Sequence, residues 1–107
     1  MKLIELVKHL KSVKESEKFT NTQLSDIEYD LIDMYMIEKV GLDSDIVFFD
    51  AEKIANKLII EIEGVTYENL FPLNMAQDMV EEFANTNAIA SDLEISEFLI
   101  NYREKDA

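Results

Sequence analysis

The chain lacks cysteine and tryptophan, and it has one histidine, His9. Without cysteine there is no disulfide framework, no thiol nucleophile and no cysteine-ligated zinc or iron–sulfur cluster. A single imidazole also excludes any site built on two histidines. These absences remove the best-known thiol and metal chemistries from the functions that the chain can carry.

Long apolar runs are missing as well. No run exceeds four residues, as at 46–49, whereas a membrane-spanning helix needs about 20. The N-terminus begins like a signal peptide, but Glu5, Lys8 and Lys11 interrupt its apolar stretch. The sequence therefore predicts no membrane partner and a cytoplasmic location.

Glycine and proline are scarce, since only Gly41, Gly64 and Pro72 occur. Few chain breakers favour long helices over a many-turned β fold. A length of 107 residues with 48% hydrophobic content fits one domain covering 1–107. We predict a mainly α fold, a compact bundle of about five helices, with 46–49 as a short extended segment.

Apolar spacing and capping motifs place the five predicted helices. Their ranges are 2–17, 25–40, 51–63, 75–85 and 91–105. Ser25 with Glu28 and Ser91 with Glu94 match the S-x-x-E capping box, in which two free backbone donors are satisfied reciprocally. The third helix has an alternative, because isoleucine and glutamate alternate near residues 59–63 as in a strand. That alternative is an α+β fold with a small hairpin using 46–49 and 58–67.

Negative charge dominates the composition. The chain has 23 Asp and Glu against 10 Lys and Arg, a formal net charge of −13. Residues 1–18 carry five lysines and three glutamates, a net +2, so residues 19–107 carry −15. Direct nucleic-acid binding is disfavoured, because phosphate neutralisation needs an excess of Lys and Arg. A field of this sign instead speeds encounter with a basic protein surface.

Two sets of side chains are candidate interaction residues. The acidic set lies on the polar faces of predicted helices 25–40 and 75–85: Asp26, Asp30, Asp33, Asp78, Glu81 and Glu82. The apolar set forms a second flank of helix 25–40 and is a candidate oligomer surface: Tyr29, Ile32, Met36 and Val40.

No catalytic, metal or cofactor motif is present. Two isolated glycines exclude a phosphate-binding loop or a nucleophile elbow. The segment 43–45 resembles the start of a calcium loop but lacks the glycine and glutamate required further on. We therefore predict a protein that is not an enzyme and uses no cofactor.

The leading functional hypothesis is an inhibitor or immunity-type factor. Its carboxylates would mimic nucleic-acid phosphates against a basic partner such as a nuclease or another nucleic-acid-binding protein. Nine lysines to one arginine suggest an AT-rich genome, as in a low-GC bacterium or its phage. The alternatives are a self-associating structural or assembly protein, and a small enzyme with a carboxylate-bound metal.

Overall fold

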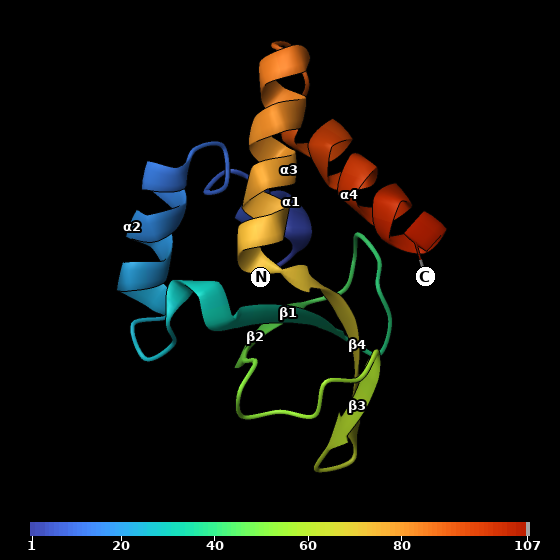
Figure 1. The fold of residues 1–107 in the computed structure, drawn as a ribbon. Helices are drawn as coiled ribbons and strands as arrows, with labels where there is room; N and C mark the ends of the chain where they lie inside the picture. Colours follow the sequence, from blue (N-terminus) through green and yellow to red (C-terminus); the bar gives the residue numbers. More distant parts are fainter. Residues whose placement is uncertain (107) are drawn as a thin grey trace.

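The computed structural model describes residues 1–106 and has an α+β architecture (Figure 1). In chain order its elements are α1 (Leu3–Val7), α2 (Val13–Gln23), the 3-10 helix η1 (Tyr29–Leu31), β1 (Ile32–Ile37), β2 (Ile46–Asp50), β3 (Ile59–Ile62), β4 (Val65–Pro72), α3 (Leu73–Thr86) and α4 (Asp92–Asp106). The four strands form one antiparallel sheet in the order β2-β1-β4-β3. The predicted mainly α five-helix bundle is therefore wrong.

The main error concerns residues 25–40, which were expected to be a helix. They contain a turn, η1 and the central strand β1. Ile32, Met34 and Met36 of β1 belong to the main core, which is the large cluster of buried apolar side chains shared by the sheet and the helices. Tyr35 is equally buried, but on the opposite face of the sheet. A strand covered on both faces loses the simple alternation of apolar and polar residues. Its apolar residues then satisfy helical spacing equally well.

The alternative strand near residues 58–63 is confirmed as β3, and the extended segment 46–49 is confirmed as part of β2. β2 pairs with β1, while β3 forms a hairpin with β4. The hairpin turn is Glu63-Gly64, with φ of 52° and 84°. Two successive positive φ values are typical of the type I′ turn that connects tightly twisted strands. Gly64 thus belongs to a hairpin turn and does not end a helix.

A glycine substitution tests this turn. No atom lies within 4 Å of a Cβ built on Gly64, so Gly64→Ala adds only the conformational cost of a positive φ. We expect a loss of about 1 kcal/mol in the free energy of unfolding, measured by urea titration. Gly41→Ala is the matched control, because its Cβ would meet only Ser44 Oγ at 3.8 Å. Equal losses in both variants would contradict the proposed turn.

The predicted helices 75–85 and 91–105 are confirmed as α3 and α4, whereas 2–17 is divided into α1 and α2. The capping box at the start of α4 is present. Glu94 N–H donates to Ser91 Oγ at 3.1 Å, and Ser91 N–H donates to the Glu94 carboxylate at 3.0 Å. These two helices were predictable because their signals are local in the chain.

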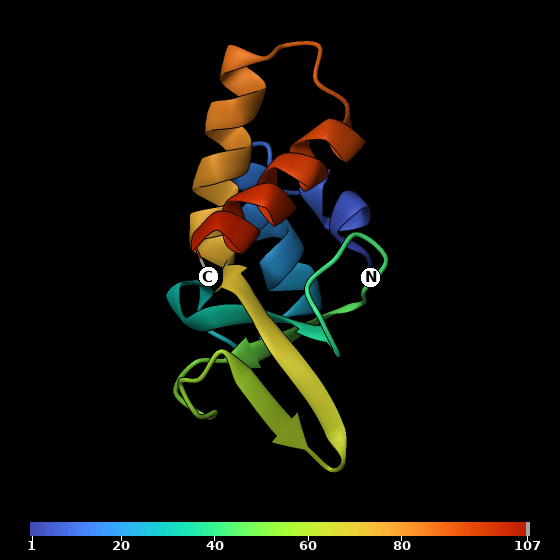
Figure 2. The ribbon, with the colours of Figure 1, turned by 90° about the vertical axis from the view of Figure 1, so that its right-hand side faces the viewer.

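The helices cover one face of the sheet (Figures 1 and 2). The main core lies between the helices and this face. The N-terminal segment contributes four side chains that are fully buried: Leu3, Leu6, Val7 and Leu10. No helix in the described part of the chain is long and apolar enough to cross a membrane.

The other face of the sheet carries a smaller aromatic cluster. The Phe49 ring makes edge contacts with Tyr35 and Tyr67, at centroid distances of 5.5 and 5.4 Å. The loop between β2 and β3 closes over this face, because the Tyr35 hydroxyl donates to the Lys57 carbonyl at 2.9 Å. Each face of β1 therefore has its own apolar contacts.

Candidate protein-interaction surface

Carboxylates from separate elements converge around Tyr29 of η1. Tyr29 is half-buried, and its hydroxyl shares a hydrogen bond of 2.9 Å with the Ser16 hydroxyl of α2. Burial raises the pKa of Tyr29, the bond to Ser16 opposes this, and Glu17, Asp78 and Asp30 raise the pKa further through their charges. The three carboxylates are therefore close enough to the Tyr29 hydroxyl to influence its pKa. We call Glu17, Asp30 and Asp78 the acidic cluster.

Helix α3 positions part of this cluster. Its buried side, which includes Ala76 and Val80, packs into the main core. Asp78 is two residues from each of them, about 160° away around the helix, so its side chain lies at the surface. Figure 1 shows α3 between α4 on one side and η1 and α2 on the other. The helix thereby presents two different surfaces to solvent.

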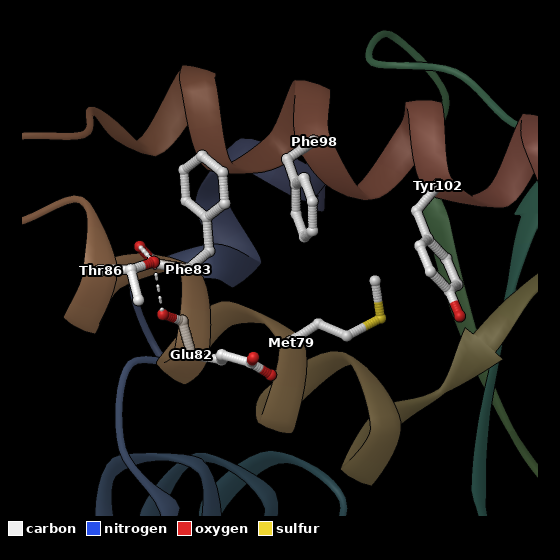
Figure 3. Close-up of a pocket in the computed structure, with 6 residues that line it drawn as sticks. All are labelled: Met79, Glu82, Phe83, Thr86, Phe98 and Tyr102. Atoms are coloured by element: carbon white, nitrogen blue, oxygen red, sulfur yellow. Dashed lines mark hydrogen bonds between the residues drawn. The ribbon is translucent and has the colours of Figure 1, made fainter.

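The second surface is an apolar groove between α3 and α4, which we call the α3–α4 groove (Figure 3). It has a volume of about 410 Å³ and is lined by Met79, Glu82, Phe83, Thr86, Phe98 and Tyr102. The rings of Phe83 and Phe98 stack with centroids 4.6 Å apart. Among the described residues, Glu82 is the only charged one in the lining. The groove can take an apolar side chain and offers one carboxylate to a neighbouring cation.

The residues of the predicted acidic set have different positions. Asp30 and Asp78 meet at the acidic cluster. Glu81 accepts a hydrogen bond from Gln77 at 2.8 Å, and Glu82 lines the α3–α4 groove. Asp26 is exposed in the turn before η1. The set is thus partly brought together along α3 and η1.

Asp33 is separated from the others, because it belongs to β1 and not to a helix. It accepts a hydrogen bond of 3.1 Å from Asn69 on β4. Burial raises the pKa of Asp33, although the bonds from Asn69 and from the backbone of Met34 oppose the rise. The expected ridge of Asp26, Asp30 and Asp33 does not exist, since strand and turn geometry replace the helical spacing.

The raised pKa of Asp33 gives a pH prediction. A group whose pKa is higher in the folded state than in the unfolded state stabilises the fold at pH values below its unfolded pKa. This contribution to the free energy of unfolding is lost as the pH rises through the pKa of the folded state. We expect Asp33→Asn, which keeps an acceptor for Asn69, to melt above wild type at pH 7. The advantage should shrink as pH falls toward the ordinary value of 3.8. Thermal melts of both proteins across this range measure the effect, and an advantage that grows on acidification would contradict it.

The apolar set is not exposed as a flank. Ile32 and Met36 are buried in the main core, and Tyr29 and Val40 pack against it. Sequence analysis also missed Glu17 and the groove. The spacing of Met79 with Phe83 and of Phe98 with Tyr102 was visible as apolar helix faces. Only the packing of α3 on α4 shows that parts of these faces stay open.

Among the described residues, no three His, Asp or Glu side chains are arranged to hold a metal ion. His9 stacks on Phe19 with ring centroids 4.7 Å apart, and Glu5 accepts a bond from the Lys2 backbone at 2.9 Å. Both side chains thus have structural contacts near the N-terminus.

Comparison with protein-family models, with curated proteins and with solved structures gives no match. Function is therefore inferred from the charge and geometry of this chain alone. Carboxylates beside an aromatic groove are suited to protein recognition, in which an apolar anchor occupies a pocket and charged groups lie around it.

Proposed function

We propose that this protein is a non-enzymatic inhibitor, of the immunity type, which binds a basic nucleic-acid-handling protein such as a nuclease. The observation that carries the proposal is that Glu17, Asp30 and Asp78 lie on three adjoining elements, because Ser16 of α2 bonds to Tyr29 of η1 and η1 contacts α3. Charges held by different elements of a packed fold keep fixed relative positions. A partner whose lysines and arginines normally contact phosphates can donate the same hydrogen bonds to these carboxylates.

The charge of the whole chain supports the same class of partner. With a net charge of −13, the protein attracts basic surfaces from a distance, and added salt weakens that attraction. The α3–α4 groove adds a short-range contact, because an apolar side chain of the partner fits against Phe83 and Phe98 while a nearby cation faces Glu82. The partner surface is therefore basic with an apolar anchor. We propose the cytoplasm as the compartment. The chain has no cysteine, whereas small proteins of oxidising compartments are often stabilised by disulfide bonds.

The direct experiment compares two triple variants of equal charge as bait in host lysate. The first neutralises the acidic cluster: Glu17→Gln, Asp30→Asn and Asp78→Asn. The control neutralises three exposed carboxylates at the end of the sheet away from η1: Glu38→Gln, Glu61→Gln and Glu63→Gln. Each variant has a net charge three units less negative than wild type, so bulk charge is matched.

We expect a basic, nucleic-acid-handling protein to be captured by wild type and by the control, and to be recovered at least about tenfold less with the cluster variant. Capture should fall between about 50 mM and 300 mM salt. Stoichiometric wild-type protein should then inhibit the nucleic-acid activity of that partner, and the cluster variant should not. Acidic partners, binding indifferent to salt, or equal loss in both variants would refute the proposal.

A further inference from the structure

A second cavity lies where the end of β4 meets the C-terminal part of α4, a junction visible in Figure 2. Its volume is about 270 Å³, and its lining consists of Leu58, Asn69, Leu70, Phe71, Pro72, Met75, Tyr102 and Arg103. Among the described side chains of residues 1–105, Arg103 is the only charged residue in this lining, and the others are mostly apolar. We call this the Arg103 cavity.

Arg103 is 8% exposed, which is unusual for an arginine without a carboxylate partner. Its Nε–H donates to the Asn69 carbonyl at 2.9 Å. Among the side chains of residues 1–105, no carboxylate lies within 4 Å of it. A guanidinium has five N–H donors, so one bond to a carbonyl leaves its terminal nitrogens available. If Arg103 served only to bond the Asn69 carbonyl at the end of β4, it would need neither its positive charge nor its remaining N–H donors.

We propose that the Arg103 cavity binds a small carboxylic acid with a short apolar tail. The two terminal nitrogens of Arg103 match a carboxylate in a bidentate pair, the geometry in which arginine binds such anions best. The tail contacts Phe71 and Met75 in the same lining. The volume is just below the usual range of about 300–1,000 Å³ for small-molecule sites, so the ligand is small.

The surrounding charge favours a specific site over loose anion binding. A protein with a net charge of −13 repels free anions from most of its surface. Among residues 1–105, no Asp or Glu lines the Arg103 cavity to oppose a bound carboxylate. The cavity is also separate from the acidic cluster, with which it shares no residue, so this proposal does not rest on the proposed function.

The test is an NMR titration of the whole chain with 3-phenylpropanoate as the probe. We expect saturable amide shifts at Leu70, Phe71 and Met75, with Kd on the order of 1 mM for a ligand of this size. The isosteric alcohol 3-phenylpropan-1-ol has the tail without the charge, and acetate has the charge without the tail. Both should bind at least about tenfold more weakly than the probe.

Arg103→Gln keeps an N–H donor for the Asn69 carbonyl but removes the charge. We expect it to weaken probe binding at least about tenfold. Lys105→Gln is the matched control, because it removes one positive charge from an exposed position of the same helix. If Arg103→Gln does not fold, Met75→Glu provides a second test. Met75 is 37% exposed, and a carboxylate there should repel the probe without disturbing the core.

Several outcomes would overturn the proposal. They are no shifts with the probe, equal binding of the alcohol, unchanged binding to Arg103→Gln or Met75→Glu, and equal loss in Lys105→Gln. A peptide ending in phenylalanine that binds at least about tenfold more tightly than the probe would also overturn it. That result would assign the cavity to the C-terminus of a protein.

Discussion

Replacing Tyr35 by alanine is expected to lower the free energy of unfolding by about 3–5 kcal/mol, as for other large aromatic side chains removed from a core. Tyr35 is 1% exposed in the central strand β1, and its ring packs edge-on against Phe49. Its hydroxyl also holds the loop after β2 through the Lys57 carbonyl. Removal therefore opens a cavity under the sheet and releases the loop that closes it. Chemical denaturation followed by circular dichroism measures the loss.

Tyr35→Phe separates these two contributions. It keeps the ring and removes the hydroxyl that donates to the Lys57 carbonyl, so the expected loss is about 1 kcal/mol. Hydrogen exchange should accelerate in residues 51–58 and stay unchanged in α3 and α4, because the main core is on the other face. A small loss for Tyr35→Ala, or a uniform increase in exchange, would show that the aromatic cluster does not stabilise this face.

Leu6→Ala is the second large expected effect, with a loss of about 2–5 kcal/mol. Helix α1 has five residues, too few to be stable as an isolated helix. Its position depends on buried side chains, and Leu6 is fully buried against the main core. Truncation removes apolar contacts that no other part of α1 can replace.

The matched control for Leu6→Ala is Val13→Ala, at a position 46% exposed near the start of α2. We expect a change within about 0.5 kcal/mol, as for most surface substitutions. Urea titration of both variants provides the comparison. Similar losses in both would mean that the N-terminal region contributes through general apolar content, and not through the specific burial of α1.

The buried N-terminal segment also connects, through Gln77, with an acidic side chain of α3. The Gln77 side-chain amide donates to the Leu10 carbonyl at 3.3 Å and to the Glu81 carboxylate at 2.8 Å. The chain after α1 thus helps to position an acidic side chain of α3. Stability of the N-terminal core and orientation of Glu81 are therefore expected to change together.

The candidate site was predictable only in part. Acidic α3 was visible from its composition and periodicity, and Asp78, Glu81 and Glu82 do lie on that helix. Asp30 joins Asp78 only because η1 contacts α3, and Glu17 joins them because Ser16 bonds to Tyr29. These contacts link positions far apart in the chain, so no spacing rule in one sequence contains them.

By itself the sequence determined the features that depend on neighbouring residues. The capping box of Ser91 and Glu94, the helical periodicity of α3 and α4, and the net charge of −13 required no tertiary information. Tertiary structure alone decided that residues 32–37 form a strand, because their backbone pairs with β2 and β4 and both faces are covered. It also buried Arg103 beside the end of β4. Pairing and burial are long-range effects, and they override weak local preference wherever apolar residues permit more than one periodicity.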